Sequence, residues 1–170
     1  MGTHEDFDAM TRYGARYAAA KHGVALSDDA CEELVAAWER VRAYDDALPA
    51  LQALHASGVR CAVLTNGTPA TSLAAMANAG IEGFIDAMLS VESAGVFKPD
   101  RSVYALVTTH YACAPADLVF ATANGWDATG AAAFGLRVAW CNRLGAPHET
   151  FGPPPTWTMR GLHDLPALIA

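Results

Sequence analysis

The chain has 170 residues, a length that suits one domain. Hydrophobic residues make up 52% of it and charged residues 17%, which excludes an intrinsically disordered chain and predicts a packed core. The formal net charge of -7 repels phosphate backbones, and no apolar run approaches the ~20 residues that span a bilayer. We therefore expect neither nucleic acid nor a membrane as a partner.

The N-terminus and the cysteines predict a cytoplasmic protein. Residues 1–6 contain neither a basic region nor an apolar stretch, so we expect no secretory signal peptide. The histidines are scattered, which argues against a zinc site. Four widely spaced cysteines form no CxxC pair and are expected to be reduced thiols: Cys31, Cys61, Cys113 and Cys141.

The N-terminal part of the chain is predicted to be helical. Apolar residues recur at helical spacing over residues 6–22, and Gly23 is a natural stop signal. Ser27 is expected to cap a second helix, and a third is expected over residues 46–57. The predicted apolar stripe of the second helix is Leu34, Val35, Trp38 and Val41.

The pattern changes after Gly58 to short apolar runs that alternate with helices. This alternation predicts βαβ units, and therefore an α/β fold with a Rossmann-like parallel sheet. We expect residues 1–45 to form a helical cap subdomain and residues 46–170 to form the α/β core. The predicted strands are 59–64, 85–91, 118–121, 136–140 and an edge strand at 156–159, and the predicted helices are 69–78, 100–111, 127–134 and 162–169.

The loops after the strands are the candidate functional segments, because ligands of parallel α/β sheets bind outside the carboxyl ends of the strands. Thr65 and Asn66 follow the first strand, Lys98 follows the second, and Asp127 lies beyond the third. Each also has a structural interpretation: Asn-Gly turn chemistry, a solvated surface charge, and a helix N-cap, respectively. The functional alternative is that Asp127 pairs with Lys98 and keeps its ammonium charged.

The order and spacing of these loops resemble motifs two to four of the haloacid dehalogenase superfamily. The segments are Leu64-Thr65-Asn66-Gly67, then Val96-Phe97-Lys98-Pro99-Asp100, then Thr122-Ala123-Asn124-Gly125-Trp126-Asp127. The Asn-x-Trp-Asp loop is more narrowly similar to (S)-2-haloacid dehalogenases of type II. The resemblance covers essentially the whole chain, with the N-terminal helices in the place of the cap.

In that family an aspartate attacks C2 of a 2-haloalkanoate, halide leaves, and water hydrolyses the aspartyl ester. The resemblance implies a small 2-halocarboxylic acid as substrate, no cofactor and no metal, and a homodimer. The catalytic residues that it implies are Thr65, Asn66, Lys98, Thr122, Asn124 and Asp127.

The resemblance also implies a substrate-binding group. Trp126 and Phe7 would form an apolar pocket around the halogen and the alkyl group, and Tyr104 would form hydrogen bonds beside them. An apolar wall that strips water from a nucleophile is coherent with this chemistry.

The chain departs from the family pattern in its first motif, an apolar strand that ends in the nucleophilic aspartate. No segment of the sequence matches that strand, and Asp6 and Asp8 fit a cap helix better. We therefore expect the 170-residue chain to be truncated and inactive as written, since a missing nucleophile prevents covalent catalysis. The loss of a central strand would also leave neighbouring strand edges unpaired.

Two other functions remain open from the sequence. One is a magnesium-dependent phosphatase of the same superfamily, although Ala123 stands where such enzymes place an extra acidic ligand. The other is a pseudoenzyme or fragment that binds small carboxylates without turning them over.

Overall fold

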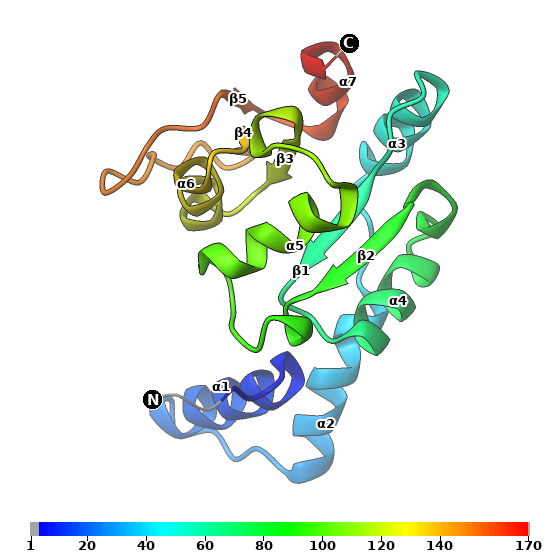
Figure 1. Cartoon of the computed structure of the whole chain (residues 1–170). Coiled ribbons are helices and arrows are strands. Elements are labelled where there is room, and N and C mark those ends of the chain that lie inside the picture. The colour runs from blue at the N-terminus through cyan, green and yellow to red at the C-terminus, as the bar shows by residue number, and fades with distance from the viewer. Residues whose placement is uncertain (1–3, 170) are drawn as a thin grey trace.

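The structure, a computed structural model, describes residues 4–169. Helices and short strands alternate after an all-helical start, as Figure 1 shows. The α-helices are α1 (Phe7–Lys21), α2 (Asp28–Ala36), α3 (Ala47–Ala56), α4 (Pro69–Asn78), α5 (Arg101–Tyr111), α6 (Gly125–Phe134) and α7 (Leu165–Ile169). The strands are β1 (Ala62–Thr65), β2 (Ala87–Ser90), β3 (Val119–Thr122), β4 (Arg137–Cys141) and β5 (Trp157–Met159).

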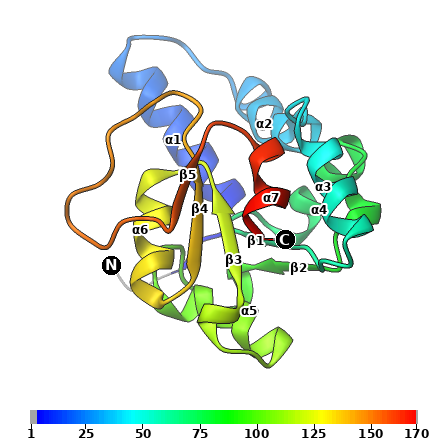
Figure 2. The ribbon, with the colours of Figure 1, turned by 90° about the horizontal axis from the view of Figure 1, so that it is seen from above.

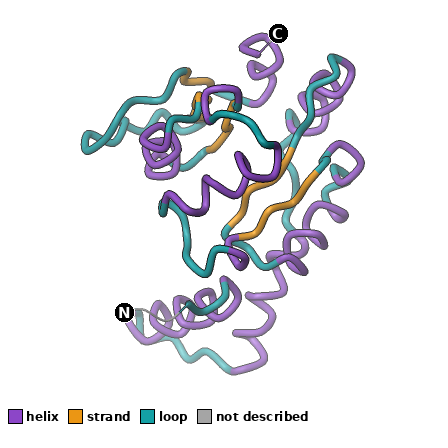
Figure 3. Tube along the Cα trace, in the orientation of Figure 1, coloured by secondary structure: helices purple, strands orange, loops and turns teal. Residues whose placement is uncertain are grey.

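Within the described residues, five short 3₁₀ helices connect these elements, and no helix is both long and apolar enough to cross a bilayer. Figure 3 shows how much of the remaining chain is loop, including the long segment between β4 and β5. The 3₁₀ helices are η1 (Ala37–Arg40), η2 (Glu82–Phe84), η3 (Val91–Ser93), η4 (Pro115–Asp117) and η5 (Leu162–Asp164).

Helices α1 and α2 form a pair that stands apart from the strands in Figure 1. Asp6 caps α1 by accepting from the amide of Ala9 (2.7 Å), and Ser27 caps α2 as expected. The stripe predicted for the second helix is only partly confirmed. Val35 is buried, but Leu34 is 49% exposed, and the helix changes to 3₁₀ geometry at Ala37.

The predicted α/β fold with parallel strands is confirmed. Strand β1 pairs in parallel with β2, and β3–β4–β5 form a second parallel ladder with β5 at its edge. Figure 2 shows the three-stranded ladder with α6 on one side and α7 on the other. The crossovers from β1 to β2 and from β3 to β4 run through α4 and α6.

Strand β4 is the centre of the core because it is buried on both faces. Its side chains alternate, as they must in an extended strand. Val138 and Trp140 pack in the cluster that contains Tyr104 of α5. Ala139 and Cys141 face the other way, into a cluster with helices α3 and α7.

The two ladders are separate in the described residues. Strand β1 pairs with β2 and β3 pairs with β4, but β1 and β3 do not pair with each other. A cavity of about 950 Å³ is lined by both strands. The edges of β1 and β3 therefore carry backbone groups that no ladder uses within residues 4–169.

Candidate active site

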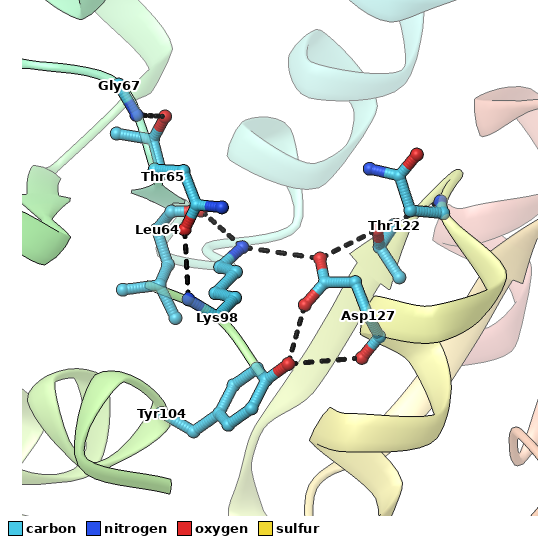
Figure 4. Close-up of polar contacts among 9 residues, drawn as sticks. Leu64, Thr65, Gly67, Lys98, Tyr104, Thr122 and Asp127 are labelled. Carbon is cyan, nitrogen blue, oxygen red and sulfur yellow. Dashed lines mark hydrogen bonds and ion pairs between the residues drawn. The ribbon is translucent and has the colours of Figure 1, made fainter. Parts of the chain in front are cut away.

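The strand ends gather polar side chains, as Figure 4 shows. Thr65 is the last residue of β1 and Thr122 is the last residue of β3. Lys98 lies in the loop between β2 and α5, and Asp127 lies in the first turn of α6. Parallel strands end at a common edge, so side chains from distant parts of the chain meet there.

Asp127 is the centre of this group. Its Oδ2 accepts from Lys98 Nζ (3.3 Å) and from Thr122 Oγ1 (3.0 Å), and its Oδ1 accepts from the hydroxyl of Tyr104 (2.7 Å). The predicted N-cap alternative for this residue is wrong, since α6 begins at Gly125 and Asn124 occupies the N-cap position. Asp127 is 3% exposed, and both of its carboxylate oxygens are occupied.

Lys98 is a buried cation held from several sides. Besides Asp127, its ammonium donates to the carbonyl of Leu64 (2.8 Å) and lies 4.8 Å from the ring centre of Phe120. Its backbone amide donates to Asn66 Oδ1 (3.1 Å), which fixes the loop. Burial lowers the pKa of Lys98, and the charge and hydrogen bond of Asp127 oppose that shift.

The loop after β1 is organised by its own side chains. Thr65 Oγ1 accepts from the amide of Gly67 (2.9 Å), and Ser90 at the end of β2 donates to the carbonyl of Gly67 (2.7 Å). A β-carbon at Gly67 would lie 2.8 Å from Ser72 Oγ, so this tight loop has little room for a side chain. Asn66 lies in this loop, and its side-chain oxygen accepts from the backbone amide of Lys98.

The cavity collects most of the residues predicted from the sequence. Those that line it are Phe7, Thr65, Asn66, Lys98, Thr122, Asn124, Trp126 and Asp127. Tyr104 is different, because it is fully buried and lies behind Asp127 rather than on the cavity wall. Burial first, and then its bond to Asp127, raise the pKa of Tyr104.

Other contributors were not identified from the sequence. Trp38 lines the cavity and packs edge-on against Phe7, with ring centres 5.5 Å apart. The sequence placed Trp38 only on a helix stripe, because helical spacing does not show which neighbour a side chain meets. The Leu64 carbonyl that receives Lys98 is a main-chain group and leaves no residue-type signal.

Other acidic side chains near the site have different partners. Asp8 accepts from Thr71 Oγ1 (3.2 Å), and Asp100 caps α5 through the amide of Ser102 (2.9 Å). Within residues 4–169, no group of three or more His, Cys, Asp or Glu side chains is arranged to hold a metal ion. The geometry therefore offers one buried cation, one engaged carboxylate and an apolar wall.

Known proteins of one family are similar to this chain in sequence and in fold. The family model for haloacid dehalogenase-like hydrolases matches residues 1–135. The chain is 33% identical over 165 residues to (S)-2-haloacid dehalogenase H-109 of Pseudomonas putida, which covers 97% of this chain and 74% of that protein.

Solved structures agree with this match. A crystal structure of an L-2-haloacid dehalogenase superposes with a TM-score of 0.94 at 30% identity, covering 98% of this chain and 73% of that chain. The L-2-haloacid dehalogenase of Xanthobacter autotrophicus, solved with chloropropionic acid covalently bound, gives 0.91 at 31% identity, with coverage of 98% and 76%. The chain therefore belongs to the haloacid dehalogenase-like hydrolases.

Proposed function

We propose that this chain builds the substrate site of an (S)-2-haloacid dehalogenase, which removes halide hydrolytically from small 2-haloalkanoic acids. The observation that carries the proposal is the buried Lys98–Asp127 pair on the wall of the cavity at the strand ends. The relatives that cover nearly the whole chain are named for this activity.

The chemistry requires an anion-binding group beside an apolar wall. The Lys98 ammonium would neutralise the charge of the substrate carboxylate and of the attacking carboxylate. Phe7 and Trp126 would exclude water from the carbon that is attacked, while Thr65 and Asn124 would offer hydrogen bonds. We assign these roles from the positions of the side chains around the cavity.

The nucleophile must be a carboxylate with a free oxygen near Lys98. Asp127 does not meet this condition, because three side chains already bind its two oxygens. Asp6 caps α1 and Asp8 binds Thr71 of α4, so both carboxylates already have other partners. We propose that the reaction uses a carboxylate that residues 4–169 do not place beside Lys98.

Chloride release from (S)-2-chloropropionate tests this function. We expect none from the 170-residue chain, and release once the N-terminal segment of the Pseudomonas putida relative is fused ahead of it. Lys98→Met in the fused protein should reduce release at least ~100-fold, since the charge that it supplies is lost. Arg101→Met is the control, because it removes a nearby cation that lies outside the cavity and donates to the Ala133 carbonyl. This variant should release chloride at most of the rate of the unmodified fused protein.

A fused, folded protein that binds (S)-2-chloropropionate yet releases no chloride would contradict the proposal. Magnesium-dependent turnover of an aryl phosphate would instead favour the phosphatase alternative. That alternative lacks support at the site, because Ala123 provides no ligand and Asp127 already binds three side chains.

We also propose that the protein is a cytoplasmic homodimer with residues 1–45 as its cap and residues 46–170 as its core. The four cysteines are all free, which suits a reducing compartment. An apolar groove of about 630 Å³ between α1, α2 and η1 supports a contact between copies. Sedimentation of the purified protein tests the dimer, and a monomer at all concentrations would contradict it.

A further inference from the structure

Gly130 occupies an unusual place for a glycine. It lies in the interior of α6, where glycine is the poorest helix former apart from proline. The helix does not stop there, since it continues to Phe134. Because glycine lowers the stability of the helix, we expect a packing contact at this position that requires the absence of a side chain.

The neighbours of Gly130 supply that contact. A β-carbon built on it would lie 2.6 Å from Cβ of Pro99 and 2.8 Å from the hydroxyl oxygen of Tyr104. Real β-carbons essentially never approach other heavy atoms below 3.0 Å, so any side chain would force a shift. Pro99 can yield little, because its ring is tied to the backbone.

Both neighbours serve the site. Pro99 directly follows Lys98 in the chain. The contact of Pro99 with Gly130 of α6 therefore fixes the position of the loop that carries Lys98. Tyr104 donates to Asp127 Oδ1, and Asp127 lies one turn before Gly130 on the same helix. The Lys98 loop and the Tyr104 hydroxyl therefore both reach Asp127 across the bare surface of Gly130.

We propose that Gly130 is a positioning residue, whose missing side chain lets the Lys98 loop and Tyr104 close onto Asp127. The proposal rests on packing around α6 and extends the proposed function without depending on turnover. Gly14, in α1, is the matched comparison. It is also within a helix, and a β-carbon there would meet nothing within 4 Å.

The test compares Gly130→Ala with Gly14→Ala in the full chain by NMR titration of the lysine ε-CH₂ groups. The resonance of Lys98 is assigned by its loss in Lys98→Met. We expect Gly130→Ala to move the titration midpoint of Lys98 by at least about half a pH unit, because the distance to Asp127 changes. Gly14→Ala should leave that midpoint in place.

A second variant separates positioning from simple crowding. Tyr104→Phe removes the hydroxyl that the new methyl group would meet, so adding Gly130→Ala to it should shift Lys98 by less than Gly130→Ala does alone, and the remaining shift comes from the contact with Pro99. If Gly130→Ala alone does not fold, restoration of folding by Tyr104→Phe would support the same contact. The proposal is overturned if Gly130→Ala folds with an unmoved Lys98 midpoint, or if Tyr104→Phe reduces neither the shift nor the unfolding.

Discussion

The carboxylate of Asp127 holds three side chains from three segments of the chain. It accepts from Lys98, Thr122 and Tyr104 at a position that is 3% exposed. A buried ion pair is costly to desolvate, so it tolerates the loss of one partner poorly. This makes Asp127 a structural centre of the site as well as a charge partner for the ammonium.

Removal of that charge should therefore destabilise the fold. We expect Asp127→Asn to lower the free energy of unfolding by about 3 kcal/mol at neutral pH, because a buried ammonium is left uncompensated. Urea denaturation followed by circular dichroism measures this loss. Asp100→Asn is the control, since Asp100 is exposed and asparagine caps a helix equally well. Equal stability of Asp127→Asn and the parent would contradict the expectation.

At the scale of elements, Asp46 connects parts of the core that are distant in sequence. It lies just before α3 and accepts from Nη1 and Nη2 of Arg143 (2.9 and 2.7 Å) and from the amide of Leu162 (2.8 Å). The hydrogen bond from Arg143 is the main cause that lowers the pKa of Asp46 from 3.8 to about 2. One carboxylate thus ties the start of α3 to the segments after β4 and β5.

The interaction of Asp46 with Arg143 predicts that the stability of the fold decreases at low pH. A carboxyl whose folded pKa is depressed stabilises the fold above its unfolded pKa, and that stability is lost as pH falls through the folded value. For Asp46 the loss lies between pH 3.8 and about 2. We expect Arg143→Met to show a smaller fall in stability across this window than the parent. Identical acid profiles from thermal melts at several pH values would disprove the role of Arg143.

The sequence predicted the type and order of the elements but missed several of their ends. A strand was expected from Val59, yet β1 begins at Ala62. The amide of Val59 donates to Leu54 and that of Cys61 donates to Asp86 Oδ2 (2.7 Å), so these residues close a helix and bind a side chain. Apolar character alone does not show where a backbone donor goes.

The pairing of side chains at the strand ends was predicted more accurately than the ends of the elements. Lys98 and Asp127 do meet, because both lie at the carboxyl ends of parallel strands, and that edge is readable from the alternation of elements. The contact between Trp38 and Phe7 was not predictable in this way. It depends on how the helices α1 and α2 pack against each other and against the core, and no local sequence pattern encodes that packing.

At the scale of the whole molecule, the two ladders leave two inner strand edges unpaired within residues 4–169. Unpaired strand edges are templates for intermolecular pairing, and a charge on the edge is the usual protection. Ala121 in β3 is exposed and lines the cavity at this edge. The chain is accordingly expected to aggregate readily on warming.

A charge placed at this edge should reduce that aggregation. We expect Ala121→Lys to raise the temperature at which light scattering begins, because an edge lysine opposes strand addition. Ala133→Lys adds the same charge at an exposed position of α6, away from the edge, and should have a smaller effect. If both variants raise the onset equally, net charge rather than the open edge controls aggregation.

The ammonium of Lys98 has a consequence for how a ligand could bind. It bridges the Leu64 carbonyl of β1 and the Asp127 carboxylate beyond β3, two ladders that share no strand pairing in the described chain. An ammonium carries three N–H donors, and the described contacts use two of them. The third hydrogen can meet an incoming anion while the other two keep the halves of the sheet joined, so that occupation of the cavity and cohesion of the fold need not compete.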